Sequence, residues 1–514
     1  MSSVNLDALI PREDFLVAGD DQKTNNLTDT ITLRDLEKGQ SFFYSSLRKP
    51  DFQRETSDWK KEKVKDFIKS FLEGDLIPSI ILWNSGQYTF VIDGAHRLSA
   101  LIAWVNDDYG DGFISQSFFN HAVEEEQKQV AEQARRLVNK DVLSYANYRS
   151  AIMSPEQAGA DILATAQKLG FLSLQVQWVK GPPEKAEQSF FTINQKATPI
   201  SDTELSLLKS RRKPQAMASR AIVRSGRGHK YWAKFSDEIK SEIENLSLEV
   251  NSAMFSPTVK NPIKTLDLPL AGKGYSTRSL PLVFDLVRLA NNYIGSNSTV
   301  DDDVDGSLTV KFLKRTNKII RRMTTTHASS LGLHPAVYFY SEKGRYQPTA
   351  FLAWVDLIKE FEVEREYENF TKNRKVFEEF LVMNKHITNQ VTVKYGSSLK
   401  GFRQLKDVYR FMYDAIKRKE DYDSLIGLLS NEYSYLNMDY RGDRTSKPDF
   451  SRDTKSEVFL TSALEGASRC ALCGGYAHVN SMHIDHIHRK QDGGLGVADN
   501  GQLSHPYCNT TFKN

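Results

Sequence analysis

Cysteine is scarce in this chain of 514 residues: it occurs three times, at positions 470, 473 and 508. A disulfide framework would need more cysteines, spread more widely along the chain. The sequence also lacks any run of about 18 apolar residues, which excludes a membrane-spanning helix. Its first residues, MSSVNLDALIPREDF, lack the basic and then apolar layout of a signal peptide, so we expect a cytoplasmic protein.

A strong charge imbalance is also missing, because the formal net charge is only +3. With 40% hydrophobic and 26% charged residues, the composition is that of an ordinary globular protein. A chain of this length buries a large core and divides into several domains. Internal repeats are absent from the sequence.

The pattern of apolar residues changes along the chain and predicts an α+β multidomain protein. An amphipathic helix is expected in 56–75, followed by short buried strands, IPSIILW and QYTFVI. Segments such as TAFLAWVDLIKEFE and LKDVYRFMYDAIKR make the middle mostly helical, with an acidic turn at 300–306. We therefore expect a polar leader over 1–45, an α/β domain over 46–210, a helical domain over 211–437, a linker over 438–456 and a small domain over 457–514.

The three cysteines lie beside histidines, which favours a metal site. Cys470 and Cys473 form a C-x2-C knuckle, and His505 and Cys508 repeat the same spacing. Three cysteines and one histidine complete a tetrahedral structural zinc site. A redox-active C-x-x-C pair is the alternative, although such a pair would not need the second knuckle.

Further polar residues lie between and after the two knuckles. The segment HIDHIHRKQDGG contains His483, Asp485, His486 and His488, none of which a structural zinc site requires. Its alternation predicts a strand, with His483 and Asp485 on one face, and the two glycines predict a tight turn. Asn500 and Asn509 follow.

Residues 470–514 resemble the HNH endonucleases with a ββα-metal core, especially the zinc-ribbon subtype typified by recombination endonuclease VII. The resemblance implies that His486 is a general base and that Asp485 and Asn509 hold a catalytic Mg²⁺ or Mn²⁺ ion. It implies that Asn500 ties the loop and orients the base, and that Lys513 contacts phosphate. An imidazole and a hard cation suit phosphodiester hydrolysis. The alternative is a zinc ribbon without catalytic activity.

The segment FVIDGAHRLSALIAW is a strand, a turn and a helix. Asp93 and Gly94 form the turn, and Asp93 is expected to cap the helix. His96 and Arg97 then lie in the first turn of the helix, where free backbone N–H groups attract anions. Taken alone, this pattern also fits a structural joint with a surface arginine.

PDFQRETSDW, GDLIPSIILW, DGAHRL and SFFTINQKATPISDTEL together resemble the ParB-like fold over residues 45–210. The likeness is to the DGQQR and DGQHR branches of GmrSD-type restriction enzymes and of proteins linked to phosphorothioate DNA modification. It implies a nucleotide pocket. Ala95 stands where these branches have glutamine, so the resemblance predicts nucleotide binding without predicting hydrolysis of a nucleoside triphosphate. The implied pocket residues are Gln53, Arg54, Asp93, Gly94, His96, Arg97 and Asn194.

A basic segment follows, with nine lysines or arginines and no acidic residue from Lys209 to Ser236. It is either a solvated helix face or a track for the DNA backbone, with Arg211, Arg212 and Lys213 as candidate contacts. The sequence as a whole predicts a metal-dependent DNA endonuclease of anti-phage restriction, regulated by a ParB-like sensing domain. The alternative is a DNA-binding regulator that does not cleave. Homo-oligomerisation is left open.

Overall fold

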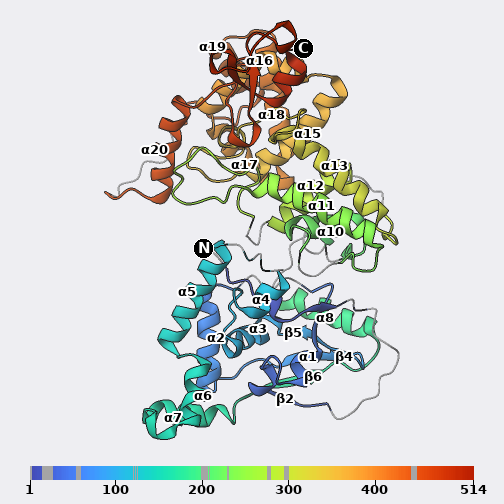
Figure 1. Cartoon of the computed structure of the whole chain (residues 1–514), viewed down its shortest axis with the longest axis vertical. Coiled ribbons are helices and arrows are strands. Elements are labelled where there is room, and N and C mark those ends of the chain that lie inside the picture. The colour runs from blue at the N-terminus through green and yellow to red at the C-terminus, as the bar shows by residue number, and fades with distance from the viewer. Residues whose placement is uncertain are drawn as a thin grey trace. The chain divides into compact units, whose positions relative to one another are not determined.

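The computed structural model of the chain describes residues 3–13, 15, 27–53, 59–119, 121, 123, 125–197, 206–207, 209–227, 231–274, 279–294, 300–440 and 448–513. The chain forms two compact units (Figure 1). The first contains Met1–Arg212, Arg227–Lys234 and Tyr275–Arg278, and the second contains Lys213–Gly226, Phe235–Gly274 and Ser279–Asn514. Each unit is described by itself.

The first unit contains a mixed six-stranded sheet in the order β1-β3-β5-β4-β6-β2. The central pair, β4 and β5, is antiparallel, whereas β3 pairs with β5 and β6 pairs with β4 in parallel. Helices lie around this sheet (Figure 1). The strands are β1 (Arg12–Glu13), β2 (Thr30–Thr32), β3 (Leu47–Pro50), β4 (Ile80–Asn84), β5 (Thr89–Asp93) and β6 (Ser173–Trp178).

The helices of this unit include the amphipathic helix expected before the central strands. In that helix, Val64, Ile68 and Phe71 recur at helical spacing and are buried, and the left-handed Gly74 ends it. The helices are α1 (Phe42–Ser46), α2 (Lys61–Glu73), α3 (Ala95–Asn106), α4 (Phe113–Phe118), α5 (Glu125–Asp141), α6 (Tyr145–Met153), α7 (Ala160–Leu169) and α8 (Pro183–Ala197).

The described part of the expected leader is packed into this unit. Strand β1 pairs with β3, and β2 pairs with β6, so residues before 45 supply both edges of the sheet. Leu9, Ile10 and Ile31 are buried in the same core as the central strands. The division of the whole chain into five segments stays a prediction.

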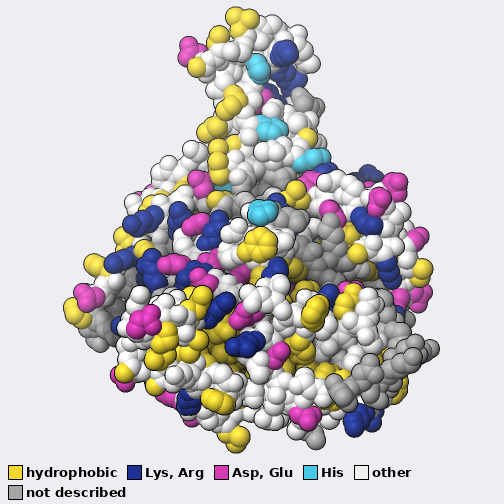
Figure 2. Space-filling model, turned by 60° about the horizontal axis from the view of Figure 1, so that its bottom comes forward, with side chains coloured by type: hydrophobic (Ala, Val, Ile, Leu, Met, Phe, Trp, Pro, Cys, Tyr) yellow, Lys and Arg dark blue, Asp and Glu magenta, His cyan; other side chains and the backbone are white. Residues whose placement is uncertain are grey.

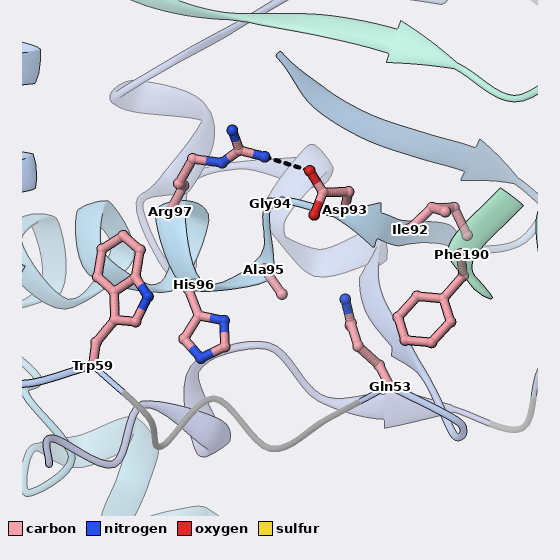
Figure 3. A pocket seen from close by; sticks show the side chains of 9 residues that line it. All are labelled: Gln53, Trp59, Ile92, Asp93, Gly94, Ala95, His96, Arg97 and Phe190. Atoms are coloured by element: carbon pink, nitrogen blue, oxygen red, sulfur yellow. Dashed lines mark hydrogen bonds and ion pairs between the residues drawn. The ribbon is translucent and has the colours of Figure 1, made fainter. Parts of the chain in front are cut away.

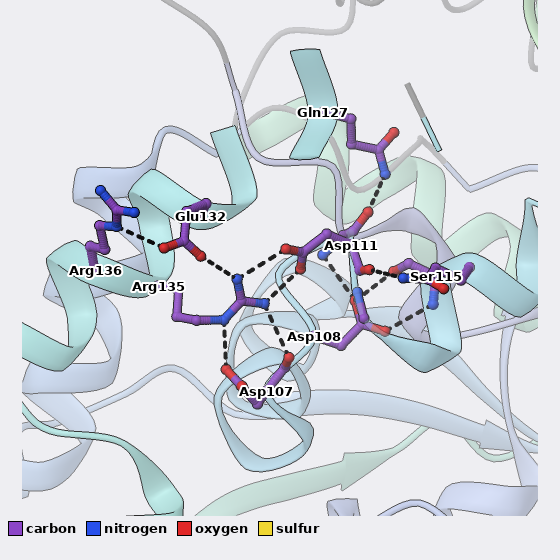
Figure 4. A network of polar contacts seen from close by, with 11 residues as sticks. Asp107, Asp108, Asp111, Ser115, Gln127, Glu132, Arg135 and Arg136 are labelled. Carbon is purple, nitrogen blue, oxygen red and sulfur yellow. Dashed lines mark hydrogen bonds and ion pairs between the residues drawn. The ribbon is translucent and has the colours of Figure 1, made fainter. Parts of the chain in front are cut away.

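A polar network joins the end of α3 to α4 and α5 (Figure 4). The Arg135 guanidinium on α5 makes ion pairs with Asp107 at 2.8 Å and with Asp111 at 2.7 Å. The buried Asp108 carboxylate accepts hydrogen bonds from the backbone N–H and the hydroxyl of Ser115. These contacts fix the turn after α3, the helix that also carries His96 and Arg97.

The second unit is mostly helical, as the middle of the sequence predicts. Its buried side chains include Trp354, Phe370 and Tyr409, which pack against one another. The helices are α10 (Pro214–Val223), α11 (Asp237–Phe255), α12 (Ser279–Ala290), α13 (Ser307–Met323), α14 (Pro335–Tyr338), α15 (Pro348–Glu364), α16 (Tyr367–Met383), α17 (His386–Tyr395), α18 (Phe402–Lys417), α19 (Tyr422–Glu432) and α20 (Arg452–Glu465).

A small hairpin follows α20 in the same unit. Strands β7 (His483–His486) and β8 (Gly501–Ser504) are antiparallel, and a short π-helical turn, Cys508–Phe512, comes after them. The mixed sheet, the helical middle and the carboxyl-terminal hairpin confirm the predicted fold class. No helix among the described residues has both the length and the apolar character needed to cross a bilayer.

Candidate zinc centre and nuclease site

The four predicted zinc ligands meet in one buried cluster. The ligand atoms of Cys470, Cys473, His505 and Cys508 all lie within 4.8 Å of one another. The first knuckle is a tight turn in which the Gly474 N–H donates to the Cys470 carbonyl at 2.8 Å. The three cysteines are free thiols, and no other group of three or more candidate metal ligands occurs among the described residues.

The His505 ring is oriented as a metal ligand requires. Its Nδ1 lies 3.3 Å from the Cys473 sulfur, whereas Nε2 lies 3.0 Å from the carbonyl oxygen of Tyr476. Nε2 therefore donates to the backbone and Nδ1 faces the sulfurs, which is the usual support for a histidine that binds a metal. Burial and the Arg374 charge oppose protonation, but hydrogen bonds to Cys470 and Cys473 raise the pKa of His505 to about 9.

The donor set fits zinc. Hydrogen bonds from Cys473 and Cys508 lower the pKa of the Cys470 thiol, so the cluster favours a thiolate and attracts a positive charge. Three sulfurs and one imidazole in one buried cluster supply the four ligands of a closed structural zinc site, which leaves no position for a substrate. The cluster thus serves folding, and any chemistry must take place elsewhere.

The hairpin places Asp485 next to two polar partners. Asp485 is 5% exposed, and Gln502, its direct partner across the hairpin, donates Nε2–H to Oδ2 at 2.8 Å. The Lys513 ammonium lies 2.8 and 3.0 Å from the two carboxylate oxygens and also donates to the backbone carbonyl of His486. A buried carboxylate with a cation beside it is a place where positive charge is favoured.

His486 lies at the end of β7, where the strand finishes. Its direct partner across the hairpin is Gly501, which has no side chain. His483 Nε2 lies 3.1 Å from the Thr326 carbonyl, which makes it a contact to the helical part of the unit. His488 is exposed.

Asn500 and Asn509 occupy different parts of the site. The Asn500 amide accepts from the His488 N–H at 2.7 Å and donates to the carbonyls of His488 and Leu495 at 3.1 and 2.8 Å. It therefore closes the loop between β7 and β8. Asn509 lies in the π-helical turn, four residues before Lys513.

The first unit contains a pocket of about 290 Å³ at the predicted nucleotide site (Figure 3). Its lining includes five of the predicted residues, together with Trp59, Ile92, Ala95 and Phe190. The Trp59 and His96 rings are stacked, with centroids 5.6 Å apart. Gln53 is buried, and its Oε1 has no hydrogen-bond partner among the described residues. The five are Gln53, Asp93, Gly94, His96 and Arg97.

The turn between β5 and α3 differs from the expected cap. Gly94 is the N-cap of α3 and no side chain caps the helix, so the capping role expected for Asp93 is wrong. The Asp93 carboxylate pairs instead with Arg97 at 2.6 Å, while the guanidinium also donates to the carbonyls of Pro78 and Ser79. Gly94 has φ +95°, and a Cβ there would lie 2.5 Å from Ile80 Cδ1, so this turn requires glycine.

Two predicted pocket residues cannot be placed. Arg54 lies outside the described residues, and the side chain of Asn194 in α8 does as well. The segment 198–205, which contributed to the ParB-like resemblance, also lies outside them. The pocket is therefore known from five of the seven predicted residues.

The basic residues after Lys209 take part in contacts within each unit. Arg211 pairs with Asp51 and Glu187 at 3.2 and 3.0 Å, and Lys213 donates to the Val300 carbonyl at 2.6 Å. Arg212 and Tyr231 are half-buried, and the other two aromatic residues of this segment, Trp232 and Phe235, are buried. On the face shown in Figure 2, basic and acidic side chains alternate. The DNA track at Arg211, Arg212 and Lys213 stays a prediction.

Sequence reasoning did not find Gln502 or the Arg374 contact to His505. Gln502 is identified by the hairpin register, which the sequence does not give, and Arg374 is 131 positions from His505. The zinc ligands, in contrast, follow from local spacing.

Comparison with known families agrees with this arrangement. Residues 33–211 match the family described as the N-terminal domain of the GmrSD restriction endonuclease, and residues 470–514 match the HNH endonuclease family. No curated protein and no solved structure matches the chain significantly. The resemblances to GmrSD-type restriction enzymes and to HNH endonucleases are confirmed, whereas the ParB-like fold and the endonuclease VII subtype stay predictions.

The two matched domains support a restriction-type nuclease that acts on DNA. Within that class, the protein joins a GmrSD-type amino-terminal domain to a carboxyl-terminal HNH domain through a helical middle, and the HNH domain contains a cluster that fits zinc.

Proposed function

We propose that this protein is a metal-dependent DNA endonuclease in which His486 is the general base. The observation that supports the proposal most is the hairpin, which brings His486 and the buried Asp485 together at the end of β7 within the HNH match. Zinc at the four-residue cluster stabilises this small segment, which has few apolar residues of its own.

In this proposal His486 removes a proton from the attacking water. An imidazole titrates near neutral pH, so it accepts a proton under the conditions in which the enzyme acts. Gly501, the residue opposite His486 in the hairpin, has no side chain that would crowd the ring. Asn500 keeps the loop after His486 closed and thereby limits the movement of the base.

Asp485 and Asn509 are the proposed ligands of a divalent ion, Mg²⁺ or Mn²⁺. Their carboxylate and amide oxygens are the hard donors that such ions prefer. When bound, the ion neutralises charge on the phosphate and helps the leaving oxygen to depart. Lys513, which now pairs with Asp485, is the proposed phosphate contact, and the exposed Arg489 and Lys490 on the adjacent loop extend this basic surface.

We further propose that the pocket of the first unit binds a nucleotide and regulates cleavage. Its stacked Trp59 and His96 rings fit a base, and Gln53 supplies an amide whose oxygen is otherwise unsatisfied. Arg97 donates to Asp93 and to two carbonyls, so it supports the turn and contacts phosphate through the remaining part of its guanidinium. Whether the pocket hydrolyses nucleotide stays open. The proposed setting is anti-phage restriction in the cytoplasm.

The alternative is a DNA-binding regulator that carries the zinc ribbon without cleaving. One observation favours it: Lys513 occupies both oxygens of Asp485, the carboxylate that a catalytic ion needs. A regulator, however, gives no reason for a histidine directly after that carboxylate at the end of the strand.

A plasmid nicking assay with Mg²⁺ or Mn²⁺ separates the two functions. We expect the wild-type chain to nick DNA and His486→Ala to lose at least about a hundredfold in rate, because a positioned general base contributes about 10²–10⁴-fold. His327→Ala is the matched control, since His327 is exposed and its ring contacts Ser329. Equal rates for wild type and His486→Ala would refute the catalytic role.

A further inference from the structure

Helix α16 carries an ion pair that is completely buried in the second unit. Arg374 Nε lies 2.7 Å from Glu378 Oε1, and the two side chains are 1% and 0% exposed. Removing two charges from water is costly, and a buried pair is stable only when its remaining donors and acceptors are also satisfied. The groups that satisfy the remaining donors and acceptors of Arg374 and Glu378 therefore show which part of the unit the pair stabilises.

Both members of the pair reach the zinc knuckles. Arg374 Nη1 lies 3.2 Å from Nδ1 of His505, and Nη2 donates to the Gly332 carbonyl at 2.7 Å. Glu378 Oε2 accepts the backbone N–H of Tyr476 at 2.6 Å. Tyr476 follows the first knuckle by three residues, and its carbonyl accepts from His505 Nε2. One network thus joins α16 to both knuckles.

The backbone around the pair is shaped for close approach. A Cβ at Gly475 would lie 2.6 Å from Arg374 Nε and 3.1 Å from Glu378 Oε2. A Cβ at Gly332, where φ is +67°, would overlap the His505 ring. Glycine at both positions lets two separate loops reach the pair and the zinc ligand.

The charge of the zinc centre explains why an arginine is there. Three thiolates and one neutral imidazole around a divalent ion carry a net charge of about −1. A buried anionic centre is stabilised by a fixed cation nearby, and a guanidinium is charged at every relevant pH. Glu378 holds Arg374 from the opposite side, aided by the hydroxyl of Tyr338 at 2.8 Å.

We propose that Arg374 is a positioning residue of the zinc centre: it supplies the counter-charge and, with Glu378, holds the loops at Gly332 and Tyr476 that surround the His505 ring. The proposal concerns the zinc site and is independent of DNA cleavage. Zinc retention by the HNH segment then depends on a residue of α16, about a hundred positions before the knuckles.

Zinc release from the full-length protein tests the proposal. Zinc is transferred to a colorimetric chelator under native conditions, and the absorption spectrum of the Co²⁺-substituted protein reports the ligand field. We expect Arg374→Met to release zinc about 10–100-fold faster, the usual effect of removing a group that supports a metal ligand. Its cobalt spectrum should shift, and Arg374→Lys should restore part of the release rate.

A matched control separates metal support from general stability. Arg410 on α18 makes ion pairs with Glu360 and Asp414 in the same unit, away from the zinc ligands. Arg410→Met should destabilise the unit and keep the wild-type zinc-release rate and cobalt spectrum. The proposal is overturned when Arg374→Met keeps both wild-type properties, or when Arg410→Met releases zinc equally fast.

A second comparison remains informative when Arg374→Met does not fold. Glu378→Gln leaves the Arg374 charge beside the zinc centre but turns an amide N–H toward a donor that Glu378 now accepts, Arg374 Nε or the Tyr476 N–H. We therefore expect zinc release from Glu378→Gln to be faster than from wild type and slower than from Arg374→Lys, which withdraws the guanidinium itself. Faster release from Glu378→Gln than from Arg374→Lys would assign the pair a purely structural role and overturn the proposal.

Discussion

Substitution of Gly332 by alanine tests how closely the zinc centre depends on the helical part of the unit. Gly332 has φ +67°, a left-handed conformation that costs a non-glycine residue about 1–2 kcal/mol. The added Cβ would also overlap the His505 ring and lie 3.0 Å from Ser481 Oγ. Overpacking of this kind costs about 1–3 kcal/mol. The total destabilisation expected for Gly332→Ala is therefore about 2–5 kcal/mol.

Gly493→Ala is the matched control for this variant. Gly493 has φ +93°, and a Cβ there meets no atom within 4 Å, so its substitution adds backbone strain without overlap. The expected loss is about 1–2 kcal/mol. An added Cβ at Gly332 meets the His505 ring, whereas one at Gly493 meets no atom. The two variants therefore differ mainly in what they do to His505.

The assay is thermal unfolding of the full-length protein together with zinc content per chain. A unit of this size shifts its midpoint by about 2 °C per kcal/mol, so we expect about 4–10 °C for Gly332→Ala and about 2–4 °C for Gly493→Ala. Gly332→Ala should also lose zinc during dialysis, whereas Gly493→Ala keeps it. Equal midpoints and equal zinc contents would refute the link between Gly332 and the zinc ligand.

Four further predictions address the other sites. Cys473→Ser should lose zinc and unfold the HNH segment, as measured by metal content and proteolysis. Asp485→Ala should keep one zinc per chain and lose nicking activity. Loss of the zinc together with the activity would contradict the division into a structural and a catalytic metal site. Gln53→Ala should weaken nucleotide binding in calorimetry by about tenfold, the effect of about 1.4 kcal/mol; unchanged binding would exclude the pocket. Burial lowers the pKa of His478 to about 4, so its protonation should cost about 3 kcal/mol of stability as pH drops from 6.5 to 4, and His478→Gln should reduce the total acid-dependent loss by about that amount.

The sequence predicts those parts of the fold whose signals are local. Helices α2, α15 and α18 follow from apolar spacing within each segment, and strands β4 and β5 overlap the two runs expected to be strands, each ending one residue beyond its run. The cysteine and histidine spacing likewise predicts the zinc cluster, because each knuckle is contained in four residues.

Long-range pairing is what the sequence does not reveal. Strands β1 and β2 have only two and three residues, and their partners, β3 and β6, lie far along the chain. Such short strands carry no usable periodicity, so the first 45 residues look like a separate leader. The Glu378 contact with Tyr476 spans 98 positions and has no sequence signature. The expected Asp93 cap fails for a related reason, because the carboxylate has a stronger partner in Arg97.

The hydrogen bond from the Tyr476 backbone to Glu378 has a consequence for protein engineering. A module that satisfies all its own polar groups can be transplanted by cutting at its linker. Transplanting residues 457–514 alone would leave this N–H and the His505 ring without the partners that α16 provides. A chimaera that retains its metal should therefore include α16 and the loop around Gly332 in the transferred fragment.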